Sequence, residues 1–133
     1  MGSLVLAPGV YTSAAGSFMI EGGDLTLDAM GDANAAWVFQ MATTLSVGGP
    51  GAAFPQNVIL VNGARAKNVY WQVGTAATIN AGGGGTVEGT IISQAGASFS
   101  TAGNTSVVTL NGRVLSLGAV VTLVNTVINV PAP

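Results

Sequence analysis

Of the 133 residues, only 6 % are charged, while 49 % are hydrophobic and 20 are glycine. Disordered chains combine low hydrophobicity with high charge, and a membrane-spanning helix needs a run of roughly 18 apolar residues; the sequence has neither feature. A net charge of −2 without a basic patch argues against nucleic acid as a partner, and nothing in the sequence predicts a membrane partner.

Short runs of Val, Ile, Thr and Leu, bounded by Gly, Asn, Asp or Pro, predict β-strands along the whole chain. Residues 1–3 look like an expression scar, and residues 4–133 are predicted to form a single domain. Residues 28–39 are the one stretch that could pass for a helix, but Gly31 and Asn34 favour a turn there. The sequence therefore predicts an all-β fold with little or no α-helix.

Four segments repeat the same pattern: an apolar strand, a corner of small residues, and a second strand with Thr or Ser beside an apolar residue. They begin at Trp37, Tyr70, Thr90 and Val114, with an irregular period of roughly 20 to 30 residues. Such self-similarity predicts the stacked coils of a β-solenoid, or β-helix. The alternative fold is a β-sandwich, in which Asn62-Gly63 and Asn111-Gly112 would be hairpin turns.

Alternation along the second strand of each repeat predicts an inward ladder and two outward columns. The inward ladder consists of Leu45, Ile79, Phe99 and Leu123. One outward column consists of Thr44, Thr78, Ser98 and Thr122, and the other of Ser46, Asn80, Ser100 and Val124. Neighbours within a column would lie roughly 4.8 Å apart, and the columns roughly 6.6 Å apart. This grid of methyl and hydroxyl groups carries no charge and could order water, although Thr and Ser also simply suit exposed strand positions.

Five motifs, in order along nearly the whole chain, resemble the DUF3494 ice-binding protein family. They are residues 6–13, 25–40, 58–74 and 87–92, and a closing segment that starts at Asn111. The resemblance implies an irregular β-solenoid of roughly triangular cross-section, with about five to six coils. It also implies a secreted antifreeze protein of cold-adapted microbes, which adsorbs to ice through a flat Ser/Thr-rich face without a cofactor. Thermal hysteresis and inhibition of recrystallisation are the activities expected.

Members of the family often carry a Thr-Ala/Gly-x-Thr/Asn pattern near the ice-binding face, and residues 75–78 and 101–104 match it. Together with the two columns, the pattern gives the predicted ice-binding residues: Thr44, Ser46, Thr75, Thr78, Asn80, Ser98, Ser100, Thr101, Asn104 and Thr122. The family's usual N-terminal coils and long helix are missing from the sequence as given. We therefore expect either a homo-oligomer, formed through an uncovered solenoid face or open coil ends, or a substitute cap made from residues 4–20.

Four of the five acidic residues lie within twelve positions, at Glu21, Asp24, Asp28 and Asp32. Calcium binding is one interpretation, but their spacing fits neither an EF-hand nor a Gly-Gly-x-Gly-x-Asp repeat. Turn formation through Asx side chains is the interpretation we favour, and no metal site is predicted. The four glycines at 82–85 lack the Gly-Lys-Ser/Thr continuation of a phosphate loop and indicate a turn.

Tyr11, Trp37, Tyr70 and Trp71 could stack on sugar rings, which makes a carbohydrate-binding or adhesin-like solenoid the alternative function. Packing under a corner is the alternative role for these aromatic residues. Without histidine or cysteine, the usual acid–base residues and thiol nucleophiles are missing. The sequence therefore predicts that the protein is not an enzyme and has no catalytic residues.

Overall fold

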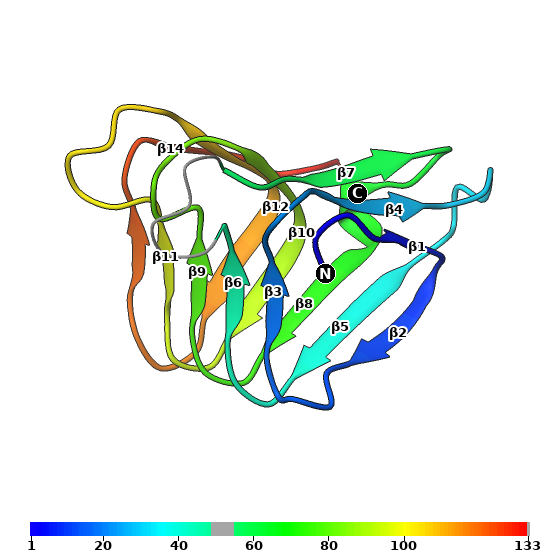
Figure 1. Cartoon of the computed structure of the whole chain (residues 1–133), viewed down its shortest axis with the longest axis horizontal. Coiled ribbons are helices and arrows are strands. Elements are labelled where there is room, and N and C mark those ends of the chain that lie inside the picture. Colours follow the sequence, from blue (N-terminus) through cyan, green and yellow to red (C-terminus); the bar gives the residue numbers. More distant parts are fainter. Residues whose placement is uncertain (49–54, 133) are drawn as a thin grey trace.

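The computed structural model describes residues 1–48 and 55–132 and forms a three-sided parallel β-solenoid (Figure 1). Sheet A contains β1 (Val5–Leu6), β4 (Leu25–Asp28) and β7 (Val58–Val61). Sheet B contains β2 (Gly9–Thr12), β5 (Trp37–Met41), β8 (Val69–Val73), β10 (Thr86–Ser93), β12 (Val108–Ser116) and β14 (Thr126–Asn129). Sheet C contains β3 (Phe18–Ile20), β6 (Leu45–Val47), β9 (Ala77–Ile79), β11 (Ala97–Phe99) and β13 (Val121–Leu123).

The paired strands of the described residues are all parallel, which confirms the solenoid and excludes the sandwich there. Asn62-Gly63 forms the turn after β7, and Asn111-Gly112 lies inside β12, so neither pair closes a hairpin. The described residues contain one short helix, the 3₁₀ turn η1 (Ala66–Asn68). No helix in the described part of the chain is long and apolar enough to cross a membrane.

Two glycines let β10 and β12 bend from one side of the solenoid onto the next. Gly89 and Gly112 are paired in register. Gly89 has φ +114°, and a Cβ at Gly112 would lie 1.8 Å from the carbonyl oxygen of Gly89. Since a Cβ never approaches an oxygen so closely, these coils require glycine at the bend.

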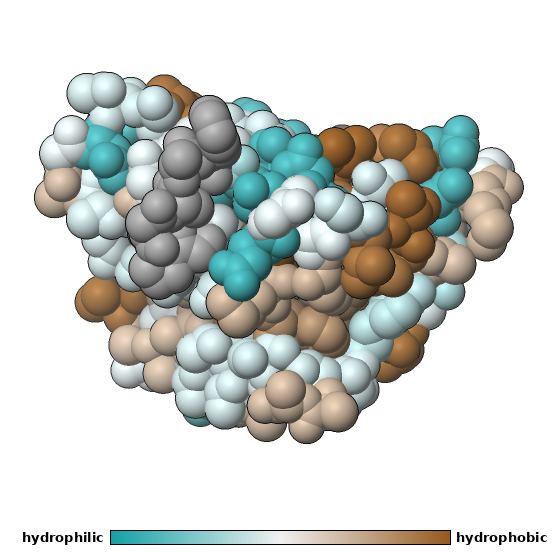
Figure 2. All heavy atoms as spheres, in the orientation of Figure 1, coloured by the Kyte–Doolittle hydropathy of each residue, from teal (hydrophilic) through white to brown (hydrophobic). Residues whose placement is uncertain are grey.

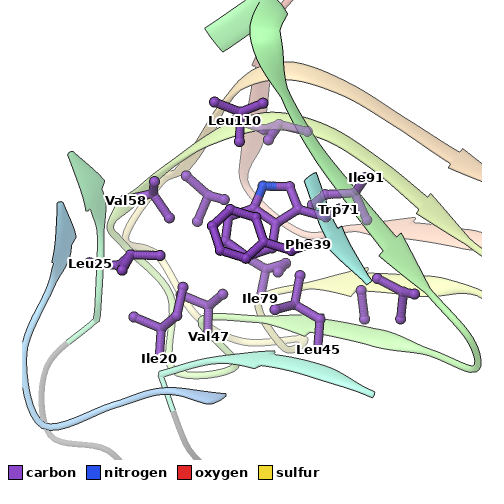
Figure 3. Close-up of a cluster of buried hydrophobic side chains, with 14 of the residues drawn as sticks. Ile20, Leu25, Phe39, Leu45, Val47, Val58, Trp71, Ile79, Ile91 and Leu110 are labelled. Carbon is purple, nitrogen blue, oxygen red and sulfur yellow. The ribbon is translucent and has the colours of Figure 1, made fainter. Parts of the chain in front are cut away.

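Side chains that alternate inward along the strands fill the interior (Figure 3). Leu123 in the end strand β13 was expected in the inward ladder, and this is wrong, because it is 46 % exposed. Tyr11, Phe39 and Trp71 are in register in sheet B and form a stack, with ring centroids 5.4 Å and 4.1 Å apart. The indole N–H of Trp71 donates to the carbonyl oxygen of Glu88 at 2.9 Å, and that of Trp37 donates to the carbonyl oxygen of Leu6 at 3.2 Å. Both buried tryptophans therefore satisfy their one polar group.

Amide and carboxyl side chains join successive coils on the outer surface. Asn111 donates to the carboxylate of Glu88 at 3.0 Å, and Asn129 donates to the side-chain oxygen of Asn111 at 3.0 Å. Burial raises the pKa of Glu88, and the hydrogen bond from Asn111 opposes that shift. These hydrogen bonds connect residues that are 23 positions apart (Glu88 and Asn111) and 18 positions apart (Asn111 and Asn129) in the chain.

Asp28 and Asp32 accept hydrogen bonds in turns, as the Asx interpretation predicts, whereas Asp24 accepts from Asn57 of the next coil. Asp28 accepts from the backbone N–H of Met30 and from the side chain of Asn62, and these hydrogen bonds lower its pKa, that from Asn62 most. Asp32 accepts from the backbone N–H of Asn34. Within the described ranges, no group of three or more His, Cys, Asp or Glu residues could hold a metal ion.

Residues 4–20 form β1, β2 and β3 and so make a regular coil rather than a cap. Each of these three strands lies at the edge of its sheet. Leu4, Val5 and Ile59 are exposed on or beside sheet A, where Figure 2 shows an apolar patch at the upper right. This part of sheet A therefore presents apolar side chains to solvent.

Candidate functional site

The corner between sheets B and C repeats most regularly along the solenoid, at the bottom of the view in Figure 1. Three successive turns at this corner, residues 42–44, 74–76 and 94–96, each have three residues between the strands. The turns before and after them are longer, at residues 13–17 and 117–120. Equal turn lengths keep side chains of adjacent coils in line, so this corner can carry a regular surface.

One outward column runs along sheet C next to this corner. Ser46, Thr78, Ser98 and Thr122 are in register across β6, β9, β11 and β13. Thr78, Ser98 and Thr122 are exposed, and Ser46 is half-buried. Inter-strand pairing spaces such neighbours by about 4.8 Å.

A second column lies on the turn itself. The backbone N–H of Thr75 donates to the carbonyl oxygen of Thr43 at 2.9 Å, and that of Ala95 to the carbonyl oxygen of Thr75 at 2.8 Å. Thr43 and Thr75 are both exposed and stand three residues before Ser46 and Thr78, respectively. Thr43 was not among the residues predicted from the sequence, although residues 43–46 repeat the Thr-x-x-Ser/Thr spacing of residues 75–78.

The predicted register of the first coil is wrong by two residues. Thr44 was expected beside Thr78, but the structure pairs Ser46 with Thr78 and Leu45 with Ala77. Thr44 is exposed on the turn, so it lies beside the columns without belonging to the one predicted. Ile79 correspondingly stacks on Val47 and Phe99 inside the solenoid.

Asn80 and Ser100 were predicted to point outward, and this is wrong, because their exposed fractions are 1 % and 6 %. Both have left-handed backbones, with φ of 45° and 64°, which ends the strand and turns the side chain inward. The amide of Asn80 donates to the carbonyl oxygen of Gln56 at 3.0 Å, and its side-chain oxygen accepts from the backbone N–H of Gln56 at 3.0 Å. These side chains hold a loop and offer no outer surface.

Residues 101–104, the other match to the Thr-Ala/Gly-x-Thr/Asn pattern, lie on the loop after β11 at the far end of the sheet C strands. Thr101 is exposed, whereas the Asn104 amide donates to the carbonyl oxygen of Ala81 at 2.7 Å and to the hydroxyl of Ser100 at 3.2 Å. The structure therefore brings Thr75 and Thr78 together with the columns and leaves residues 101–104 apart from them.

The aromatic residues considered as a sugar platform are mostly inside the molecule. Trp37 and Trp71 have 0 % exposure, Tyr11 is half-buried, and Tyr70 alone among the four is exposed. A stacking platform needs aromatic faces open to solvent, so these four residues do not form one.

The outer face of sheet B differs in chemistry from the B/C corner. One of its columns contains Val10, Val38, Tyr70, Thr90 and Arg113, and the other Thr12, Gln40, Gln72, Ile92 and Leu115. These side chains vary in length, polarity and charge. The two columns at the corner hold short, uncharged side chains, and Figure 2 shows a near-neutral surface at the bottom of the view.

The family model described as Ice-binding-like matches residues 1–129. An ice-binding protein of Flavobacterium frigoris is 32 % identical over 127 residues, which cover 96 % of this chain and 40 % of that protein. Ice-binding protein 1 of Shewanella frigidimarina is 40 % identical over 72 residues, or 54 % of this chain and 8 % of that protein. The crystal structure of an ice-binding protein from an Antarctic biological consortium superposes with a TM-score of 0.80 at 34 % identity, covering 95 % of this chain and 51 % of that one.

This chain thus spans about half or less of the length of these proteins. The match of the family model nevertheless extends over nearly all of it, and the fold agrees with the solved relative. The chain belongs to the ice-binding-like protein family.

Proposed function

We propose that the protein is an antifreeze protein that adsorbs to ice through the hydroxyl surface at the corner of sheets B and C. The hydroxyl surface consists of Thr43, Thr44, Ser46, Thr75, Thr78, Ser98 and Thr122. The observation that carries the proposal is the register of Ser46, Thr78, Ser98 and Thr122 in four adjacent strands.

The chemistry of the hydroxyl surface suits a solid made of water. Each Thr offers a methyl group, which water surrounds in an ordered layer, and a hydroxyl group, which joins that layer by a hydrogen bond. Charged side chains would hold water in orientations that do not match a lattice, and the hydroxyl surface contains none. Repetition at about 4.8 Å along the columns lets several hydroxyl groups engage one layer together.

The mechanism that follows is adsorption and requires no catalytic group or cofactor. Many weak contacts made at once by one rigid face hold the protein on the crystal. Ice between adsorbed molecules then grows with a curved front, which lowers the local freezing point. Thermal hysteresis and slower recrystallisation are the expected activities, and we propose that the protein acts outside the cell and is not an enzyme.

Thr78→Tyr tests the choice of face, because Thr78 is exposed at the centre of the column. We expect thermal hysteresis, measured in a nanolitre osmometer, to fall sharply while the circular dichroism spectrum stays unchanged. Gln72→Tyr is the matched control, since Gln72 is exposed on sheet B one strand earlier in the chain. Loss of activity in Gln72→Tyr with full activity in Thr78→Tyr would assign ice binding to sheet B. Round crystals and no freezing gap with the unchanged protein would refute ice binding by this chain.

The partner we propose is therefore the ice surface, and we also propose that the protein associates with copies of itself. Support for self-association comes from the exposed side chains of Leu4, Val5 and Ile59 on or beside sheet A. No observation favours the carbohydrate-binding alternative, since Trp37 and Trp71 are inaccessible to a sugar ring.

A further inference from the structure

A serine occupies a core position directly beneath the hydroxyl surface. Ser93 lies at the end of β10 and points into the solenoid with 0 % exposure. On one side, its register partner Val73 in β8 and Met41 beyond it in β5 fill the inward column with apolar side chains, and on the other side its register partner in β12 is the half-buried Ser116. A buried hydroxyl in such a column is costly unless it is hydrogen-bonded, so its contacts indicate why it is there.

The hydroxyl group of Ser93 joins two neighbouring turns of the B/C corner. The hydroxyl group can donate to two carbonyl oxygens. One is that of Thr75, which lies 2.7 Å from the Oγ atom of Ser93, and the other is that of Gly96. The same two oxygens also accept backbone N–H groups, from Ala95 at 2.8 Å and from Ala77 at 3.1 Å. Ser93 therefore reinforces the backbone hydrogen bonds between the turn that contains Thr75 and the turn that contains Gly96.

These two turns carry adjacent members of the hydroxyl surface. Thr75 is part of one turn, and Ala77, whose N–H is bonded to Gly96, directly precedes Thr78. Gly96 precedes Ser98 by two residues and has φ +112°, a conformation that glycine adopts readily. The separation between Thr78 and Ser98 thus depends on how firmly the two turns are held together.

We propose that Ser93 is a positioning residue for ice binding, which fixes the spacing between the coil of Thr75 and Thr78 and the coil of Ser98 without touching ice. The proposal rests on the proposed function of the hydroxyl surface. Ice presents a fixed repeat, so a surface whose rows shift relative to one another engages fewer lattice positions at a time. A buried link close to the surface limits such shifts better than a contact elsewhere in the core.

Ser93→Ala removes the link, Ser93→Thr keeps the hydroxyl, and Val73→Ala is the matched control. Val73 lies in the same inward column, one coil away, and contributes only apolar packing. We measure thermal hysteresis, the melting temperature, and amide hydrogen exchange at Ala77 and Ala95. We expect Ser93→Ala to lower hysteresis and to speed exchange at these two amides, Ser93→Thr to restore both, and Val73→Ala to lower the melting temperature with hysteresis retained.

Full hysteresis in Ser93→Ala would overturn the proposal, as would an equal loss in Val73→Ala, because that would assign the effect to core stability in general. If Ser93→Ala does not fold, Ser93→Cys replaces it, since a thiol has a similar shape and is a weak donor. If Thr78→Tyr leaves hysteresis intact, the face is wrong and the proposed function of this surface fails. Exchange at Ala77 and Ala95 still reports whether Ser93 holds the corner, so the two failures are distinguishable.

Discussion

Replacing Trp71 by alanine tests whether the aromatic residues stabilise the fold or bind a ligand. Trp71 is fully buried and stacks on Phe39 with centroids 4.1 Å apart and ring planes 11° from parallel. Its indole N–H donates to the carbonyl oxygen of Glu88 at 2.9 Å. The side chain thus supplies packing to β5 and β8 and a hydrogen bond to β10.

The expected loss of stability follows from these contacts. A buried Trp→Ala substitution costs about 3–5 kcal/mol through lost burial and the cavity that remains. The lost hydrogen bond adds about 1 kcal/mol. A total of about 4–6 kcal/mol is a large part of the roughly 5–15 kcal/mol that keeps a typical domain folded.

Urea unfolding followed by far-ultraviolet circular dichroism measures this loss. Tyr70→Ala is the control, because Tyr70 precedes Trp71 on the same strand but points outward; its free energy of unfolding should change by about 0.5 kcal/mol or less. A loss below about 2 kcal/mol in Trp71→Ala would refute the packing argument. Such a small loss accompanied by lost glycan binding would instead support the sugar platform.

Two further predictions concern charge and the length of the outward column. Burial raises the pKa of Glu88, so the folded chain binds that proton more tightly than the unfolded chain, and the stability contributed by Glu88 falls as pH rises above about 4. Glu88→Gln should therefore have a higher melting temperature than the parent protein at neutral pH, and this difference should vanish in acid. A difference in melting temperature that stays constant from about pH 4 to pH 7 would contradict the prediction. Met19→Thr should raise thermal hysteresis, because exposed Met19 pairs with Ser46 at one end of the column, whereas Val10→Thr on sheet B should not; equal effects would contradict the choice of face.

The sequence could predict the solenoid because its strands, corners and inward residues repeat. It did not determine the register, since alternation has a period of two and a shift by two residues keeps every side chain on its face. From the sequence, the segment 44–46 therefore matches the segment 78–80 as well as the segment 45–47 matches 77–79, which is the pairing in the structure. The equal length of the turns at residues 42–44 and 74–76 decides between them, but it is visible only once the strand ends are known.

The ends of the sheet C strands were mispredicted for a different reason. Asn80 and Ser100 continue the alternation in sequence, but their left-handed backbones break it in space. Asn is enriched in that conformation and stands before a glycine-rich segment, so a turn could have been suspected at Asn80. No comparable signal marks Ser100, whose conformation depends on the hydrogen bond between its backbone N–H and the carbonyl oxygen of Ile79, and on the loop that follows.

In the described part of the chain, each strand pairs only with the strand of the coil before and the strand of the coil after. Such a stack is close to one-dimensional, so its free energy is roughly a sum of coil terms and nearest-neighbour terms. If the end strand β13 separates from β11, fraying continues inward coil by coil. The central strands β8 and β10 have neighbours on both sides and would open last. Thr75, Thr78 and Ser98 of the hydroxyl surface lie on those central coils, so this part of the surface proposed to meet ice is also the part of the stack that thermal motion opens least.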